Sequence, residues 1–261
     1  MTNKTRQEWR LLETPPLDPF MNMAVDEAIS QGVRRRESPP TFRFYGWSSP
    51  SISIGYFQQL LATIDQPRCN ELNVLPVRRL TGGGAVLHHR EITYSVVAGS
   101  HLNGFRSIHE TYLTLSEGLV RGLRRLGIPA EISPGGPERH RRDSYCFDRP
   151  ARHEIVVQGR KLIGSAQRRW REAFLQHGSI LLSLDERYLS CIRGAVSSAG
   201  SIGLEELLGP GGAYMDNIKT SLAEEIGNVL FARWTPGKLT EQEESSIGPL
   251  IDKYRRWTAK I

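Results

Sequence analysis

The stretch RRLTGGGAVLHHREITYS, residues 78–95, guides the interpretation of the whole chain. Three consecutive glycines interrupt an apolar segment that has two arginines before it and two histidines after it. Glycine lets the backbone approach a bound oxygen closely, and consecutive amide groups in such a turn can hold an anion or a carbonyl. The stretch therefore predicts either a ligand-binding loop between two strands or a glycine-rich turn without a ligand.

The glycine run does not match the two common nucleotide-binding loops. A Walker loop ends in Gly-Lys followed by Ser or Thr, whereas Gly84 is followed here by Ala and Val. A dinucleotide fingerprint requires a helix directly after the glycines, and residues 85–88 have the composition of a strand. The loop is therefore not assigned to either class.

Short segments rich in β-branched and aromatic residues surround this stretch and predict strands. Before it, strands are expected at residues 41–47, 51–55 and 74–80. Pro76 places the last of these at a sheet edge, because proline cannot donate to a neighbouring strand. After the glycines, residues 85–88 and 92–98 are expected to pair as a hairpin. Further strands are expected at residues 130–132, 154–158, 161–167 and 174–184.

Two helices are expected among these strands. Asp18 followed by Pro19 is a typical helix start, an N-cap residue before a proline in the first turn, and we expect a helix that continues to Arg35. Ser107 opens a second helix with a capping box, and its regular apolar stripe continues until Gly127. We expect that stripe to pack against the core rather than to carry chemistry.

The order of elements predicts an α+β fold. Strands are concentrated before residue 184, and the pattern after it is mainly helical. We expect a single domain over residues 1–261, in which residues 203–261 form a helical cap. The segment 133–150 is a long irregular stretch with a dense basic cluster, and loops of that length are often functional or disordered.

Composition limits the class of protein. The chain has 261 residues, 39% hydrophobic content and a formal net charge of +6, which together predict a folded domain. Three cysteines without a C-x-x-C pair exclude a disulfide framework and a zinc ribbon, and favour a reducing compartment. No signal peptide and no apolar run of about 20 residues is present, so we expect a soluble cytoplasmic protein without a membrane span.

Cys146 is the candidate nucleophile. Arginines at positions 141, 142, 149 and 152 and a histidine at 153 lie close to it in sequence. Cationic neighbours favour the thiolate, which is the nucleophilic form of cysteine. The alternative is a small buried hydrophobic residue. Cys69 and Cys191 lack such neighbours, and we assign both to packing or surface.

Lys161 and the histidines are weaker candidates. Lys161 follows a tight turn, and the predicted hairpin could bring it back to the segment of Cys146, where an ammonium would stabilise a thiolate or a substrate oxygen. The alternative is an ordinary exposed lysine. His88, His153 and His177 form no pair at helical spacing, which argues against a metal site.

Several motifs in order resemble the biotin/lipoate protein ligase and transferase family. Besides residues 78–95, the chain carries GRKLIGSAQ at 159–167 and LQHGSILL at 175–182. NMAVDEA at 22–28, FRFYGW at 42–47 and SIGYFQ at 53–58 are also similar to that family. The resemblance covers most of the chain and implies a mixed, largely antiparallel β-sheet flanked by helices.

The segment CFDRP at 146–150, shortly before EIVVQGRK at 154–161, resembles the octanoyltransferase branch of this family. The resemblance implies that Cys146 becomes an acyl thioester and that Lys161 lies beside it. The substrate-contacting residues expected on this basis are Arg79, Gly82, Gly83, Gly84, His88, Gly164, Ser165, Ala166 and His177. The chain departs from the family pattern at Gly84, His89 and His153.

The implied reaction moves an octanoyl group from acyl carrier protein to a lysine of a lipoyl domain, such as the glycine cleavage H protein. Because a thioester donor is already activated, no ATP or other cofactor is expected. The basic surface would then serve acidic protein partners rather than nucleic acid. Two alternatives remain open: an ATP-dependent lipoate-protein ligase that acts through an acyl-adenylate, and a non-catalytic protein that binds acyl groups or lipoyl domains.

Overall fold

Two β-sheets organise the chain in a computed structural model that describes residues 6–102, 105–135, 145–147, 153–195, 199–209 and 214–259. The larger sheet has the strand order β11-β1-β2-β6-β10-β9-β8-β7. Its strands in chain order are β1 (Gln7–Glu13), β2 (Thr41–Tyr45), β6 (Arg90–Gly99), β7 (Glu131–Ile132), β8 (Ile155–Val157), β9 (Arg160–Arg169), β10 (Ala173–Ser183) and β11 (Ala232–Pro236).

The pairing within the larger sheet is mixed. β1 runs parallel to both β11 and β2, and every pairing from β2 across to β7 is antiparallel. The expected α+β fold with a mixed, largely antiparallel sheet is therefore confirmed.

The smaller sheet consists of β4 (Leu75–Arg78), β3 (Ser51–Ile54) and β5 (Val86–His88), in that order. β3 is parallel to β4 and antiparallel to β5. Pro76 therefore lies on an edge strand, as the sequence predicts. The glycine loop connects β4 with β5 and so lies at one end of this sheet.

The predicted hairpin between residues 85–88 and 92–98 is wrong. β5 pairs with β3 in the smaller sheet, while β6 lies between β2 and β10 in the larger one. The reason is burial: nine consecutive residues of β6 are buried, so the backbone N–H and C=O groups along both of its edges need hydrogen-bond partners. A two-stranded hairpin would pair only one edge, whereas β2 and β10 pair both.

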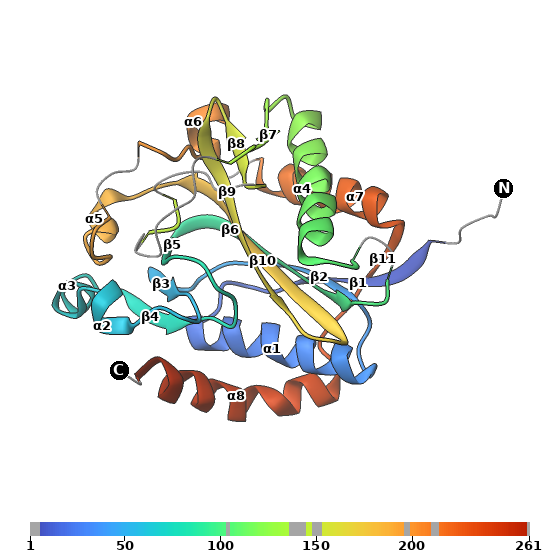
Figure 1. Cartoon of the computed structure of the whole chain (residues 1–261), viewed down its shortest axis with the longest axis horizontal. Coiled ribbons are helices and arrows are strands. Elements are labelled where there is room, and N and C mark those ends of the chain that lie inside the picture. Colours follow the sequence, from blue (N-terminus) through green and yellow to red (C-terminus); the bar gives the residue numbers. More distant parts are fainter. Residues whose placement is uncertain are drawn as a thin grey trace.

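Helices cover the larger sheet in two layers (Figure 1). α1 (Pro19–Arg35) and α8 (Glu241–Ala259) lie side by side along one side, and α4 (Ile108–Arg125) and α7 (Met215–Leu230) lie on the opposite side. The shorter helices are α2 (Leu60–Thr63), α3 (Gln66–Glu71), α5 (Glu186–Leu189) and α6 (Leu204–Leu208).

Both predicted helix starts are confirmed. The Asp18 side chain accepts hydrogen bonds from the backbone N–H groups of Phe20 and Met21, at 2.9 and 3.3 Å. The Ser107 hydroxyl accepts from the N–H of Glu110 at 3.0 Å. Such side-chain caps satisfy amide groups that have no partner within the helix and typically stabilise it by about 1 kcal/mol.

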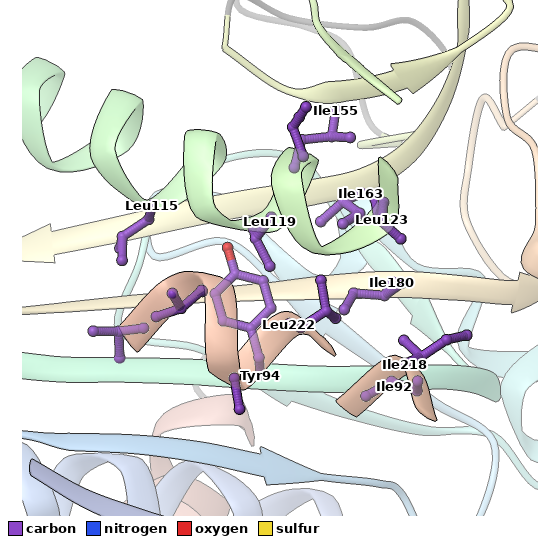
Figure 2. Close-up of a cluster of buried hydrophobic side chains, with 14 of the residues drawn as sticks. Ile92, Tyr94, Leu115, Leu119, Leu123, Ile155, Ile163, Ile180, Ile218 and Leu222 are labelled. Atoms are coloured by element: carbon purple, nitrogen blue, oxygen red, sulfur yellow. The ribbon is translucent and has the colours of Figure 1, made fainter. Parts of the chain in front are cut away.

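The predicted stripe on α4 packs into the main hydrophobic core, as Figure 2 shows. Leu115, Leu119 and Leu123 point from one face of α4 towards the strands of the sheet. The side chains of Ile163 and Ile180 meet them from β9 and β10. This burial holds the sheet in place without using any group that could do chemistry.

The C-terminal part of the chain holds more than helices. Residues from 203 onward include α6, α7 and α8, but also β11, which pairs in parallel with β1 at the edge of the larger sheet. The sequence interpretation missed both strands. In β1 and β11, polar and apolar residues do not alternate regularly between buried and exposed positions. The alternation that marks a strand in a sequence is therefore weak.

The predicted hairpin at residues 154–167 is confirmed as β8 and β9. Gln158 and Gly159 at its turn have φ angles of 53° and 74°. Two consecutive residues with positive φ are typical of the tight turn whose twist matches antiparallel strands. Val156 lies opposite Lys161, so the hairpin fixes where Lys161 enters the sheet. Within the described residues, no helix combines the length and apolar character needed to cross a bilayer.

Candidate active site

Cys146 is held against the far end of the glycine loop. Its backbone N–H donates to the carbonyl of Ala85 at 2.8 Å, and Tyr145 forms a bridge with the same residue. Ala85 directly follows Gly84, so the loop and the cysteine share a short stretch of backbone pairing. The cysteine is half-buried. Its sulfur therefore remains within reach of a molecule in the adjoining cavity, whose wall includes Cys146.

Lys161 reaches Cys146 from β9. Its Nζ atom lies 3.4 Å from Cys146 Sγ and donates to the Cys146 carbonyl at 2.8 Å. The lysine is fully buried, and its own backbone is fixed by hydrogen bonds to Gly200 and Ile202. The hairpin thus brings the lysine and the cysteine together. A cation at this position stabilises a thiolate.

A buried carboxylate accompanies the lysine. Glu154, just before β8, accepts a short hydrogen bond from Lys161 Nζ and is only 7% exposed. Phe147 covers the same ammonium, with Nζ 4.7 Å from the ring centroid. A buried charge is costly unless it is paired, so Glu154 and the ring hold the ammonium beside the sulfur.

Gly164 is required by the position of Lys161. A Cβ atom at this residue would lie 2.8 Å from Lys161 Cε, 3.0 Å from Nζ and 3.2 Å from the Phe147 ring. Any larger side chain would displace the lysine. The neighbouring Ser165 is fixed from two sides, because its hydroxyl bonds the Tyr94 hydroxyl at 2.7 Å and its carbonyl accepts from Tyr112 at 2.7 Å.

Arg79 holds the glycine loop together. Its guanidinium donates to Thr81, to the Ser53 carbonyl and hydroxyl, and to the carbonyls of Gly82 and Gly84, at distances from 2.7 to 3.1 Å. A guanidinium has five N–H groups, and all five are used here. Arg79 therefore shapes the loop, and it also lines the cavity, where we predicted that it contacts substrate.

His88 belongs to a network of mutually satisfied polar groups. Its Nδ1 pairs with the Glu91 carboxylate at 2.8 Å, its Nε2 pairs with the Ser53 hydroxyl at 2.7 Å, and its ring stacks on Trp47 at 3.9 Å. Glu91 also accepts from the hydroxyls of Thr93 and Ser179. Burial alone would raise the pKa of Glu91, but His88 and these hydroxyls hold it below its usual value.

His177 belongs to a similar network on β10. Its Nε2 pairs with the Thr81 hydroxyl at 2.7 Å, and its Nδ1 lies 3.5 Å from the carboxylate of Asp26 on α1. Asp26 also accepts from Arg43 and Ser95, at 2.8 and 2.9 Å. Burial lowers the pKa of His177, because the imidazolium is disfavoured away from water. His177 is therefore the neutral imidazole near pH 7.

These groups surround a cavity of about 700 Å³. The predicted residues on its wall are Arg79, Gly83, Gly84, His88, Cys146, Gly164, Ser165, Ala166 and His177. Of the other two predicted residues, Gly82 lies in the loop away from the wall, and Lys161 lies behind the cysteine. Apolar wall is supplied mainly by Met23, Tyr45, Trp47, Phe57 and Val86. The volume is typical of sites for small organic ligands.

The two remaining cysteines occupy a different environment. Cys69 and Cys191 are completely buried within one hydrophobic cluster. Burial raises the pKa of Cys69 to about 12 and also raises that of Cys191. Neither thiol faces the cavity, and both ionise less readily than an exposed thiol.

The sequence interpretation missed the partners that surround the candidate residues. Glu154 could have been found as an acidic residue at the start of an otherwise apolar hairpin. Asp26 could have been found as a carboxylate on the buried face of α1. The arginines at 141, 142, 149 and 152, which suggested an activated Cys146, lie outside the described residues, as does most of the irregular segment 133–150. No group of metal-binding side chains occurs among the residues that are described.

Comparison with known proteins places these features in a family. Residues 18–226 match the family model described as the lipoyl protein ligase A/B catalytic domain. The octanoyltransferase LipM of Kyrpidia tusciae is 42% identical, over 95% of this chain and 96% of that protein. The octanoyltransferase LipM of Moorella thermoacetica is 43% identical, again over 95% of this chain and 96% of its own length.

Two solved structures share the fold. A lipoate-protein ligase A bound with ATP superimposes with a TM-score of 0.81 and 27% identity, over 97% of this chain and 98% of that one. A bi-partite lipoate protein ligase from Thermoplasma acidophilum, studied with its E2 lipoyl domain, gives a TM-score of 0.74 and 26% identity, over 95% of this chain and 93% of that one.

Proposed function

The chain belongs to the lipoyl protein ligase A/B catalytic domain family and is an octanoyltransferase, and we propose that it carries the octanoyl group as a thioester on Cys146. The observation that carries this proposal is the contact between Cys146 Sγ and the buried Lys161 Nζ, 3.4 Å apart at the wall of the cavity. A cysteine sulfur beside a cation that stabilises its thiolate is an arrangement suited to covalent acyl transfer.

The first step acylates the enzyme. The Cys146 sulfur, as a thiolate paired with the Lys161 ammonium, forms a bond with the carbonyl carbon of the donor thioester. The bond from that carbon to the donor sulfur breaks, and the leaving thiolate takes the proton from the Lys161 ammonium. Glu154 stabilises the ammonium while it exists. One thioester replaces another, so the step needs no separate source of energy.

The second step releases the product. The amine of the acceptor lysine attacks the acyl carbon and gives a proton to the Lys161 amine, the bond to Cys146 Sγ breaks, and the pair of Cys146 thiolate and Lys161 ammonium is restored. An amide replaces a thioester, which makes this step favourable. The acceptor must reach the same face of the sulfur as the donor, because both react at one carbon in one cavity.

Oxyanion stabilisation is assigned to the glycine loop. Gly83 and Gly84 line the cavity, and among the described residues no group accepts a hydrogen bond from the N–H of either glycine. The N–H of Cys146 is not a candidate, because it already donates to Ala85. Free amides held rigidly by Arg79 are suited to the negative charge that forms on the carbonyl oxygen.

The donor and acceptor follow from the class of reaction. We assign octanoyl-acyl carrier protein as donor and a lipoyl domain, such as the glycine cleavage H protein, as acceptor. The formal charge of +6 supports docking of acidic carrier domains, since complementary charge speeds association. The relationship to a ligase studied with its E2 lipoyl domain supports an acceptor of this type.

Intact mass spectrometry tests the proposal. Incubation with octanoyl-acyl carrier protein, without nucleotide, should add the mass of one octanoyl group to the wild-type protein and to Cys191→Ala, but none to Cys146→Ala. Addition of an apo H protein should then move that mass to the acceptor. A folded wild-type enzyme that acquires no adduct overturns the proposal.

The likeness to an ATP-bound lipoate-protein ligase makes an ATP-dependent ligase the second candidate. The same variants separate the two. A ligase would modify the H protein from free octanoate and ATP, and would retain that activity in Cys146→Ala. A non-catalytic binding protein would bind both partners but transfer nothing under either condition.

A further inference from the structure

A second cavity, of about 520 Å³, lies beside the first. It is bordered by α1, α8 and the segment that leaves β9. We call it the aromatic–basic groove, after the six side chains that characterise it: Arg34, Tyr56, Arg168, Trp170, Arg256 and Trp257. None of these residues takes part in the chemistry described above.

The groove continues from the acyl cavity along β9. Side chains two residues apart on a strand share a face, and Gly164, Ala166 and Arg168 follow that spacing. The first two line the cavity and the third lines the groove. Four residues of strand span about 13 Å, so Arg168 lies about that far along β9 from the glycine that contacts Lys161.

Two further segments connect the same two spaces. On α1, Met23 lines the cavity and Glu27, one helical turn later, lines the groove. In the loop after β3, Tyr56 lines the groove and the next two residues line the cavity. Three separate segments thus run from one space to the other, and an elongated molecule could occupy both.

The groove carries positive charge that the protein does not neutralise. Within the described part of the chain, neither Arg168 nor Arg256 has a carboxylate partner. Arg34 has only a loose contact of 3.8 Å with the exposed Glu172. The single carboxylate among the described lining residues, Glu27, is bound through both oxygens by Lys253 at 2.6 Å. An anion would therefore meet unpaired arginines and no free acidic group.

Aromatic rings hold two of these arginines, Arg168 and Arg34, in place. The Arg168 guanidinium lies 5.0 Å from the centre of the Tyr56 ring and 5.8 Å from that of Trp170, and Arg34 lies 5.1 Å from the same tryptophan. Ring contacts of this kind restrict a flexible side chain while leaving its N–H groups available. A surface arginine that serves only for solubility needs no such support.

We propose that the aromatic–basic groove binds the phosphodiester of the phosphopantetheine arm that carries the acyl group into the adjoining cavity. The inference rests on the proposed function, because it names the donor-side subsite of the same reaction. A donor arm joins an acyl thioester at one end to a phosphate at the other, which matches an apolar cavity that continues into a basic groove. The acceptor reacts through a lysine side chain, which carries no phosphate.

Donor kinetics test the subsite. The double variant Arg168→Gln with Arg256→Gln should lower kcat/KM for octanoyl-acyl carrier protein by at least about tenfold, the usual effect of losing hydrogen bonds to a charged group. Octanoyl-pantetheine, which lacks the phosphate, should react equally with wild type and variant. The matched control, Arg121→Gln with Arg233→Gln, removes the same charge from α4 and β11 and should change neither donor by more than about twofold.

Two kinetic outcomes overturn the proposal. Equal losses for both donors would mean that the arginines act without reference to the phosphate. A change confined to the acceptor's KM would make the groove a docking site for the lipoyl domain.

A binding experiment keeps this proposal separate from the transferase mechanism. Tryptophan fluorescence should report binding of 4′-phosphopantetheine to the wild-type protein, much weaker binding of pantetheine, and loss of the difference in the Arg168, Arg256 double variant. Equal binding of the two compounds overturns the subsite, even in an enzyme that is acylated normally. Selective binding of the phosphorylated compound supports it, even if Cys146 acquires no octanoyl group and the transferase mechanism fails.

Discussion

The cavity has two polar regions that differ in how they use their charges. In the reacting corner, formed by Cys146, Lys161 and Glu154, one ammonium serves a half-buried sulfur that faces open space. In the polar wall, formed by the networks of His88 and His177, each polar group is bonded to another protein group. In the proposed mechanism the corner provides chemistry, while the wall provides shape and stability.

The largest effect is expected in the corner, from Gly164→Ala. The added Cβ would lie within 3.0 Å of Lys161 Nζ and force the ammonium away from the sulfur. A displacement of about 1 Å at a reacting group can cost on the order of 10²-fold in rate. Acylation of Cys146 by octanoyl-pantetheine, measured by stopped-flow or quenched mass spectrometry, should slow by about 10- to 100-fold.

Gly82→Ala is the matched control for that variant. Gly82 lies in the glycine loop, but a Cβ atom there would meet nothing within 4 Å. Its acylation rate should stay within about twofold of wild type, because no neighbour has to move. If both glycine variants slowed the reaction equally, the effect would belong to general disturbance of the site rather than to the lysine.

Substitutions in the polar wall should lower the free energy of unfolding more clearly than they slow acylation. Glu91 is the partner of the buried His88 Nδ1 and accepts from the hydroxyls of Thr93 and Ser179, so Glu91→Leu would leave the His88 nitrogen without its partner. An unsatisfied buried group costs about 1–3 kcal/mol. Urea unfolding should reveal that loss, while acylation of the folded variant slows less than in Gly164→Ala.

A variant of Glu91 that unfolds like wild type but fails to acylate would break the distinction between the two regions. In that case the His88 network would belong to the chemistry. Retention of the acylation rate together with reduced stability would sharpen the distinction.

A smaller effect is expected from His177, in the same polar wall, on the pH dependence of stability. Because burial lowers the pKa of His177, the folded protein keeps this imidazole neutral while the unfolded chain takes up a proton below about pH 6.5. The stability that depends on neutral His177 is therefore fully present above that pH. It is lost as the pH falls towards the lower pKa that His177 has in the folded protein. Between those limits one group changes stability by at most about 1.4 kcal/mol per pH unit.

His177→Gln removes that titration. Urea unfolding at pH 7 and pH 5 should give a smaller fall in stability for the variant than for wild type. Asp26, whose pKa is held low by Arg43 and His177 although burial opposes this, titrates mainly below this range. Identical pH dependence in the two proteins would mean that the fold leaves the pKa of His177 at its unfolded value.

The contrast between the two regions also explains what could be predicted from the sequence. Local patterns gave α1, α4 and the β8–β9 hairpin, because caps, an apolar stripe and a tight turn act within a few residues. The role of Arg79 could not be predicted, because its five partners come together only after β3 and the loop have folded. Cys146 and Lys161 were candidates from their sequence neighbours and the predicted hairpin, and the family resemblance gave them their expected roles. The contact between Glu154 and Lys161 requires the structure.

The smallest effect concerns the acyl chain itself. We expect the octanoyl group to lie along the apolar wall that includes Met23, Trp47 and Val86. Burying one methylene is worth about 0.8 kcal/mol, which is about fourfold in kcat/KM. Heptanoyl-pantetheine should therefore react about fourfold less efficiently than octanoyl-pantetheine with wild-type enzyme, in an assay that follows release of the free thiol.

The same comparison in Val86→Thr locates the chain. Threonine has almost the same size as valine but places a hydroxyl at the wall, which weakens the preference for the longer acyl group without changing the space available. Equal reactivity of heptanoyl and octanoyl donors with wild-type enzyme would place the end of the chain in water. The apolar wall would then shape the space around Cys146 without selecting for the length of the acyl chain.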